Sequence, residues 1–117
     1  MEANPEGLDK IWCQIQALIL PTSWKQEGVE PPNDIAKKTA YECCLTLFNK
    51  TRLLPTVIAC TKENGVYMTF VSGKKLIVEA YNDGEIGALI NDDSKKVILY
   101  NEDILNSNLD RCIKKFI

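Results

Sequence analysis

The stretch TVIACTKENGVYMTFVSGKKLIVEAYNDGEIGALINDDSKKVILY, residues 56–100, decides the fold. Short segments of alternating apolar and polar residues are separated there by turn residues such as Asn64-Gly65 and Asp83-Gly84. The segments predicted as strands are Thr56–Cys60, Val66–Val71, Lys75–Tyr81, Glu85–Ile90 and Lys96–Tyr100. Because the loops between them are too short for crossover helices, we expect a five-stranded antiparallel meander sheet.

The lengths of the turns also predict which residues lie opposite each other. Three-residue loops at 72–74 and 82–84 and a four-residue last loop bring the apolar residues of four strands onto one face. The expected pairs are Phe70 with Leu76, Met68 with Val78, Val66 with Ala80, Ala80 with Ile86, Val78 with Ala88, Leu76 with Ile90, Ile90 with Val97 and Ala88 with Leu99. The register between the first two strands stays open.

Helices are expected on both sides of this stretch. A first helix begins near Gly7 and ends before Pro21, with a buried stripe at Leu8, Ile11, Trp12, Ile15, Leu18 and Ile19. A second is capped by Asn33, ends around Asn49 and buries Ile35, Ala36, Thr39, Ala40, Cys43, Cys44, Leu47 and Phe48. A last helix begins near Glu102. The prediction is therefore one α+β domain, residues 1–117, of order α-α-β-β-β-β-β-α, with the helices on one face of the sheet.

Composition excludes several classes of function. The 117 residues carry a net charge of −2 with acids and bases interleaved, which disfavours binding to nucleic acid. No apolar run is long enough to span a bilayer, and the acidic N-terminal residues are unlike a signal peptide, so we expect a cytoplasmic protein without a membrane partner. The odd number of cysteines, five, in apolar surroundings indicates reduced, structural thiols.

Few features of the sequence are typical of a catalytic site. The absence of histidine removes the Ser-His-Asp and Cys-His arrangements and the common zinc sites. Neither of the glycine-rich phosphate-binding patterns occurs. Carboxylates are the remaining route, but Glu79 on the central strand has no converging acidic partner in the pattern. We therefore predict no catalytic residue, no metal ligand and no cofactor.

Residues 18–90 resemble a group of small bacterial proteins of unknown function. The resemblance rests on Leu20 with Trp24, Gly28 and Pro31, on Ala36 and Ala40, on Pro55-Thr56-Val57, on Asn64-Gly65-Val66, on Glu79 and on Asp83-Gly84-Glu85-Ile86. Members often carry a Trp-Asp-Gly-Tyr-Gly-like loop, which Lys25-Gln26-Glu27 interrupts here. The resemblance implies the same fold and a bacterial, cytosolic setting, and it implies no activity.

Two surfaces are candidates for binding. The sheet face opposite the apolar one carries tyrosines and β-branched residues where a solvated face would carry more charge, a composition typical of interfaces. Its candidate interface residues are Tyr67, Ile77, Glu79, Tyr81, Ile98 and Tyr100. Trp24, in a polar loop, is either a binding anchor or a plug at the junction of helices and sheet, and the plug is favoured.

These surfaces predict a non-enzymatic protein-interaction domain, either a homodimer or a subunit that binds a protein partner through the open sheet face. The alternatives are a carboxylate-based, metal-dependent enzyme and a small-ligand-binding domain with a cavity between sheet and helices.

Overall fold

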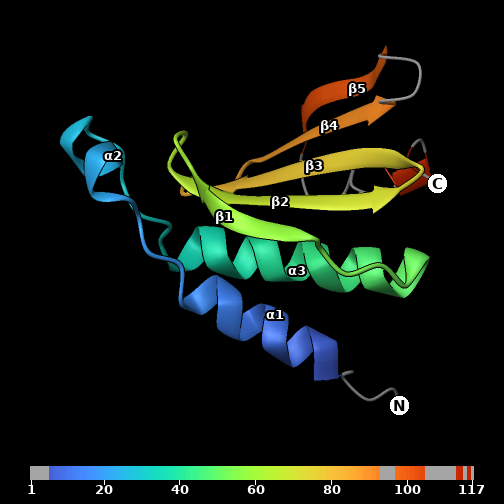
Figure 1. Ribbon diagram of the computed structural model, residues 1–117, viewed down its shortest axis with the longest axis horizontal. Helices are drawn as coiled ribbons and strands as arrows, with labels where there is room; N and C mark the ends of the chain where they lie inside the picture. The colour runs from blue at the N-terminus through green and yellow to red at the C-terminus, as the bar shows by residue number, and fades with distance from the viewer. Residues whose placement is uncertain (1–5, 93–96, 105–112, 115, 117) are drawn as a thin grey trace.

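The computed structural model describes residues 6–92, 97–104, 113, 114 and 116, and side chains for all of these except Glu6, Asp92 and 97–104. It is an α+β fold with an antiparallel sheet, as predicted (Figure 1). The helices are α1 (Glu6–Gln16), α2 (Thr22–Gln26) and α3 (Asp34–Thr51). The strands are β1 (Val57–Thr61), β2 (Gly65–Ser72), β3 (Lys74–Tyr81), β4 (Ile86–Asp92) and β5 (Val97–Ile104).

The strands follow one another across the sheet in chain order, β1-β2-β3-β4-β5, and every pair is antiparallel. The predicted register of the two central pairs is confirmed, since Met68 lies opposite Val78 and Val78 opposite Ala88. Pairing of β2 with β3 continues to Ser72 and Lys74, and Gly73 takes the positive φ of 74° that the turn requires. The first pair, left open by the sequence, sets Ala59 opposite Tyr67.

The predicted register of β4 and β5 is wrong. Ile90 pairs with Tyr100 rather than Val97, and Ala88 pairs with Glu102 rather than Leu99. Two features cause the difference. The β4 strand runs on to Asp92, and the register then shifts between Ile90 and Asn91, an irregularity of the bulge type that no turn length reveals.

The last predicted helix cannot begin near Glu102, because β5 extends to Ile104 and pairs there with Ile86. The length of β4 explains this, since its backbone finds hydrogen-bonding partners only if β5 continues to its far end. Most of the predicted helix lies outside the described residues. Ile113 and Phe116 are each 1% exposed and belong to the same core cluster as α3 and the inner sheet face.

The α3 helix packs against the inner face of the sheet and forms one side of the core. Asn33 caps it as predicted, since its side-chain oxygen accepts a hydrogen bond from the backbone N–H of Ala36 at 2.9 Å. Ala36 and Ala40 are fully buried, so their small side chains let the helix approach the sheet closely. The helix continues past Asn49 to Thr51 and ends where Arg52 adopts a left-handed conformation.

The α1 helix is shorter than predicted and ends at Gln16. Because Ile19 lies beyond the end of the helix, it is 83% exposed, and Leu20, which is 3% exposed, is buried in the core instead. Ile35, also predicted to be buried, is 54% exposed on the first turn of α3. The segment expected as a loop after Pro21 contains the one-turn helix α2, which has no buried residue.

Candidate functional site

The outer face of the sheet, turned away from α3, is the main candidate binding surface. One row of facing residues crosses four strands and consists of Val57, Thr69, Ile77 and Leu89. The next row contains Ala59, Tyr67, Glu79 and Gly87. Tyr67, Ile77, Glu79 and Tyr81 are all half-buried, as is Leu89, whereas Val57 is 47% exposed. The sequence-predicted residues of β2 and β3 therefore lie together on one surface.

The polar side chains on this face either form hydrogen bonds with a neighbouring strand or lie at intervals along β3. The Thr61 hydroxyl donates a hydrogen bond of 2.8 Å to Oε1 of Glu79, which holds that carboxylate over β1 and β2. Lys75 and Glu79 lie on the same strand, on either side of Ile77, with all three side chains on the outer face by alternation. An apolar centre thus lies between opposite charges.

Ile98 and Tyr100, the other predicted interface residues of the sheet, are described only by their backbone. Ile98 pairs with Asn91, next to the outer-face row of Lys75. Tyr100 pairs with Ile90, a fully buried residue of the inner face, so the register no longer groups Tyr100 with the outer-face residues. Because the register shifts between Ile90 and Asn91, Ile98 stays beside the outer-face residues and Tyr100 does not.

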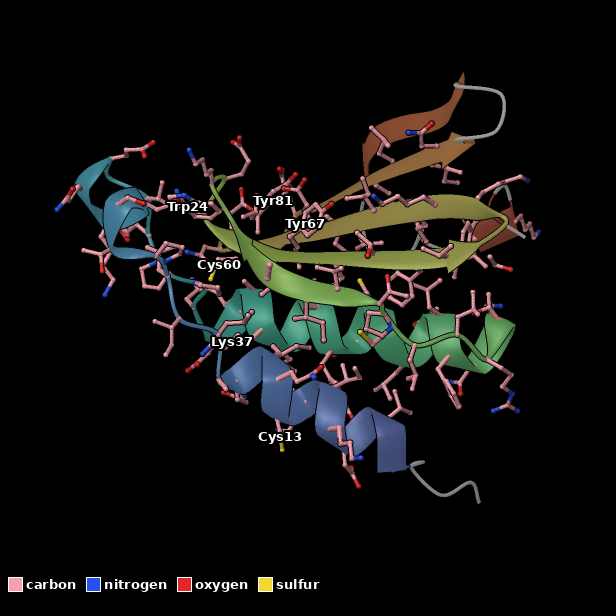
Figure 2. The ribbon with its side chains drawn as sticks, viewed as in Figure 1. Cys13, Trp24, Lys37, Cys60, Tyr67 and Tyr81 are labelled. Atoms are coloured by element: carbon pink, nitrogen blue, oxygen red, sulfur yellow. The ribbon has the colours of Figure 1, made fainter. Side chains whose placement is uncertain are left out.

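Trp24 lies on α2 and does not enter the core, so the plug prediction is wrong. Its ring is half-buried and lies beneath the Lys62 ammonium, which is 5.4 Å from the ring centroid. Lys62 also forms a 3.5 Å ion pair with Glu27. These contacts fasten α2 to the turn between β1 and β2, at the end of the sheet where Figure 2 also shows Tyr67 and Tyr81.

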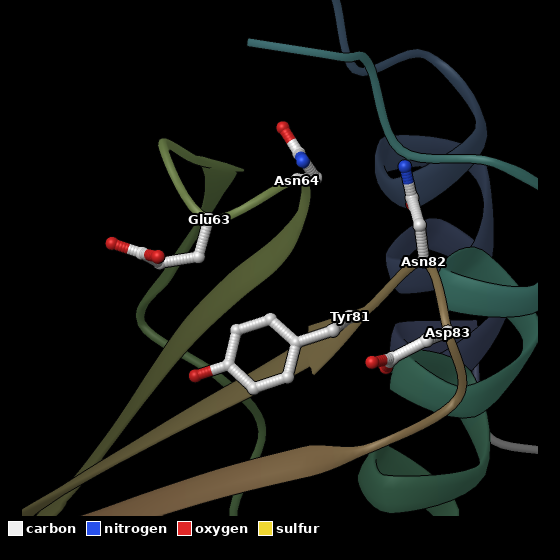
Figure 3. A pocket seen from close by; sticks show the side chains of 5 residues that line it. All are labelled: Glu63, Asn64, Tyr81, Asn82 and Asp83. Atoms are coloured by element: carbon white, nitrogen blue, oxygen red, sulfur yellow. The ribbon is translucent and has the colours of Figure 1, made fainter.

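A polar pocket of about 390 Å³ opens at the same end of the sheet and is lined by Glu63, Asn64, Tyr81, Asn82 and Asp83 (Figure 3). Two of its residues are structural links. The Asn64 side chain accepts from the Glu30 backbone, and the Asn82 side chain accepts from the Asn33 backbone and donates to the Pro31 carbonyl. The sequence identified Asn64 and Asn82 as turn residues and gave no sign that they bind the segment before α3.

The cysteines are separated by environment. Cys43, Cys44 and Cys60 are buried, as predicted, but Cys13 is exposed on α1, and Cys112 lies outside the described residues. Burial, and next the neighbouring Cys43, raise the pKa of Cys44, whose thiol lies 3.3 Å from the sulfur of Met68. Burial also raises the pKa of Cys60, against a smaller opposing effect of Lys37. Neither thiol is poised as a nucleophile at neutral pH.

In comparisons with known proteins, no protein-family model, no curated protein and no solved structure matches the chain. Among the described residues, no group of three or more Cys, Asp or Glu side chains is arranged to hold a metal ion. None of the described helices has the length and apolar character needed to cross a membrane. The resemblance to small bacterial proteins stays a prediction, and function has to be argued from the surfaces themselves.

Proposed function

We propose that this chain is a cytoplasmic, non-enzymatic protein-interaction domain whose outer sheet face is the binding surface, and that it binds a second copy of itself there. The observation that carries the proposal is the row of Val57, Thr69, Ile77 and Leu89 across the outer face. A sheet face exposed only to water would carry charged or polar residues at these positions. Tyr67 beside this row adds a side chain that interfaces favour.

The arrangement of charges favours a second copy over an unrelated partner. Two sheets can pack face to face around a twofold axis that passes beside Ile77, parallel to the sheets and perpendicular to β3, and their β3 strands then run in opposite directions. Lys75 of one copy then meets Glu79 of the other, and the same pair forms again on the opposite side of the axis. The face is therefore complementary to itself in charge as well as in apolar character.

A charge-exchange experiment tests this pairing. Lys75→Glu places two carboxylates opposite each other in a homodimer, and Glu79→Lys places two ammonium groups there, so each variant alone is expected to self-associate at least about tenfold more weakly. An equimolar mixture of the two variants restores both opposite-charge pairs. Sedimentation over a concentration series should show monomers for each variant and a dimer for the mixture.

A second variant tests the apolar part of the surface. Tyr67→Ala with Ile77→Ser should weaken self-association by about 30-fold or more, with an unchanged circular dichroism spectrum. Ser72→Ala, at an exposed position near the end of β2, is the matched control and should associate like the wild type. A wild-type protein that stays monomeric at high concentration, or a mixture of charge variants that stays monomeric, would overturn the self-association proposal.

A further inference from the structure

The outer edge of β1 is paired with no other strand among the described residues. Among the described strands, β1 pairs with β2 alone and is the first strand of the sheet. An edge strand directs the N–H and C=O groups of alternate residues outward, ready to pair with another strand. Edges are commonly protected by charged residues or proline, but Val57–Thr61, with the sequence VIACT, contains neither.

A groove lies beside the start of this edge, where the chain enters β1. It has a volume of about 530 Å³ and lies between α1 and the segment that enters β1, with Gly7, Ile11 and Ala17 on the helix side and Leu54, Pro55 and Ile58 on the other. Figure 1 shows α1 beyond α3 as seen from the sheet, and Ile58 is the residue of β1 that lines the groove. A strand added at the normal spacing of about 4.8 Å from β1 would direct every second side chain toward the helix side of the sheet, where those near the start of β1 lie beside the groove.

The groove also selects the chemistry of what it binds. Its described lining is mostly apolar, and Lys10 is the charged residue in it. Lys37 lies close enough to Cys60 to influence the pKa of that thiol, and its ammonium donates to the backbone carbonyl of Gln16 at the end of α1. An apolar side chain suits the groove lining, and a carboxylate suits Lys10.

A second copy does not suit this edge. Two β1 strands paired across a twofold axis lie about 4.8 Å apart, and each copy would bring its own α1 to the same side of the joined sheet. Packed helices need about 8–10 Å between their axes, so this pairing requires room between two α1 helices that an added peptide strand does not require. Each copy would also present a Lys10 in a groove whose described lining holds no carboxylate. An extended peptide carries no such helix.

We propose that β1 and the groove beside α1 form a peptide-binding site, in which an acidic, extended segment of another protein adds a strand to the sheet and inserts alternate apolar side chains into the groove. This is the strand-addition mode of recognition, with backbone hydrogen bonds for affinity and a side-chain pocket for specificity. The site is separate from the outer sheet face, so it stands or falls independently of self-association.

The test begins with a phage library of short random linear peptides selected on the wild-type protein. The expected sequences have apolar residues at every second position with Asp or Glu nearby. A synthetic peptide of the selected sequence is then measured by isothermal titration. Lys10→Glu should weaken its binding about tenfold or more. Lys38→Glu, an equally exposed lysine on α3 outside the groove, is the matched control and should leave affinity unchanged.

N-methylation of the peptide backbone reports the strand pairing directly. An added strand donates N–H groups to β1 from alternate residues only, so methylation at one set of alternate residues should reduce affinity about tenfold or more, and at the other set little. Three results with peptides overturn the proposal: no peptide is selected, the selected peptides lack the alternation, or methylation shows no alternating effect. A fourth is that the wild-type chain dimerises and the Lys10→Glu variant does not, which would make the occupant a second copy.

Discussion

Cys44 shows how burial alone changes the chemistry of one residue. The side chain is fully buried between α3 and the sheet, with its thiol against the sulfur of Met68. Burial raises the pKa of Cys44, so the folded protein holds this proton more tightly than the unfolded chain does. The stabilisation from this group is complete below the ordinary thiol pKa of about 8.5 and is lost as the pH rises above it.

A substitution at this residue isolates the effect. Above pH ~8.5, the free energy of unfolding of the wild type should fall more steeply with pH than that of Cys44→Ala, by up to about 1.4 kcal/mol per pH unit. Urea unfolding at a series of alkaline pH values measures both slopes. Cys13→Ala, at an exposed position, is the control and should follow the wild type. Equal slopes for the wild type and Cys44→Ala would contradict the role of burial.

At the scale of elements, Asn33 joins a helix to a strand connection. Its side-chain oxygen caps α3 through the N–H of Ala36, and its side-chain nitrogen donates to the backbone carbonyl of Asn82 at 3.1 Å. The Asn82 side chain in turn accepts from the backbone N–H of Asn33. One asparagine therefore both starts the helix and fixes it beside the turn between β3 and β4.

Two substitutions separate these contributions. Asn33→Ala removes the cap and the donor, and we expect a loss of about 1–2 kcal/mol in the free energy of unfolding. Asn33→Asp keeps an oxygen for the Ala36 N–H and loses only the donation to Asn82, so its loss should be smaller. Thermal or urea unfolding measures both. If Asn33→Asp is as destabilising as Asn33→Ala, the cap contributes little and the link to Asn82 dominates.

The elements also show which parts of the structure a sequence can predict. The register of β2, β3 and β4 followed from turn chemistry and alternation, because Gly73 and Gly84 both take the positive φ that their turns require. The register shift near Ile90 is not visible in the sequence pattern, so the pattern assigned Tyr100 to the wrong group of residues. Trp24 was misjudged for a different reason, since its partner Lys62 is distant in sequence and the contact is tertiary.

At the scale of the whole molecule, protection is unequal between the two sides of the sheet. The inner face is covered by α3 and by Ile113 and Phe116, whereas none of the described helices covers the outer face. The interior strands β2, β3 and β4 are paired on both sides, but β1 is paired on one side only among the described strands. The α2 helix has no buried residue at all.

Amide hydrogen exchange should reproduce this gradient. We expect the slowest exchange in β2 and β3, faster exchange in β1, and the fastest in α2, because opening α2 exposes almost no apolar surface. Exchange measured residue by residue at neutral pH and low protein concentration checks the order. Protection of α2 as strong as that of β3 would show that α2 and the segments joined by Asn64 and Asn82 open only when the whole protein unfolds.

The strand order has a kinetic consequence. Each strand of the sheet pairs with the strand that precedes or follows it in the chain, through connections of a few residues. Closing such short loops costs little chain entropy, so the search that makes mixed sheets slow to fold is largely avoided. The sheet can form one hairpin at a time around turns such as the one at Gly73. We therefore expect the docking of α3 onto β2 and β3, which are more distant from it in the chain, to be the slow event in folding.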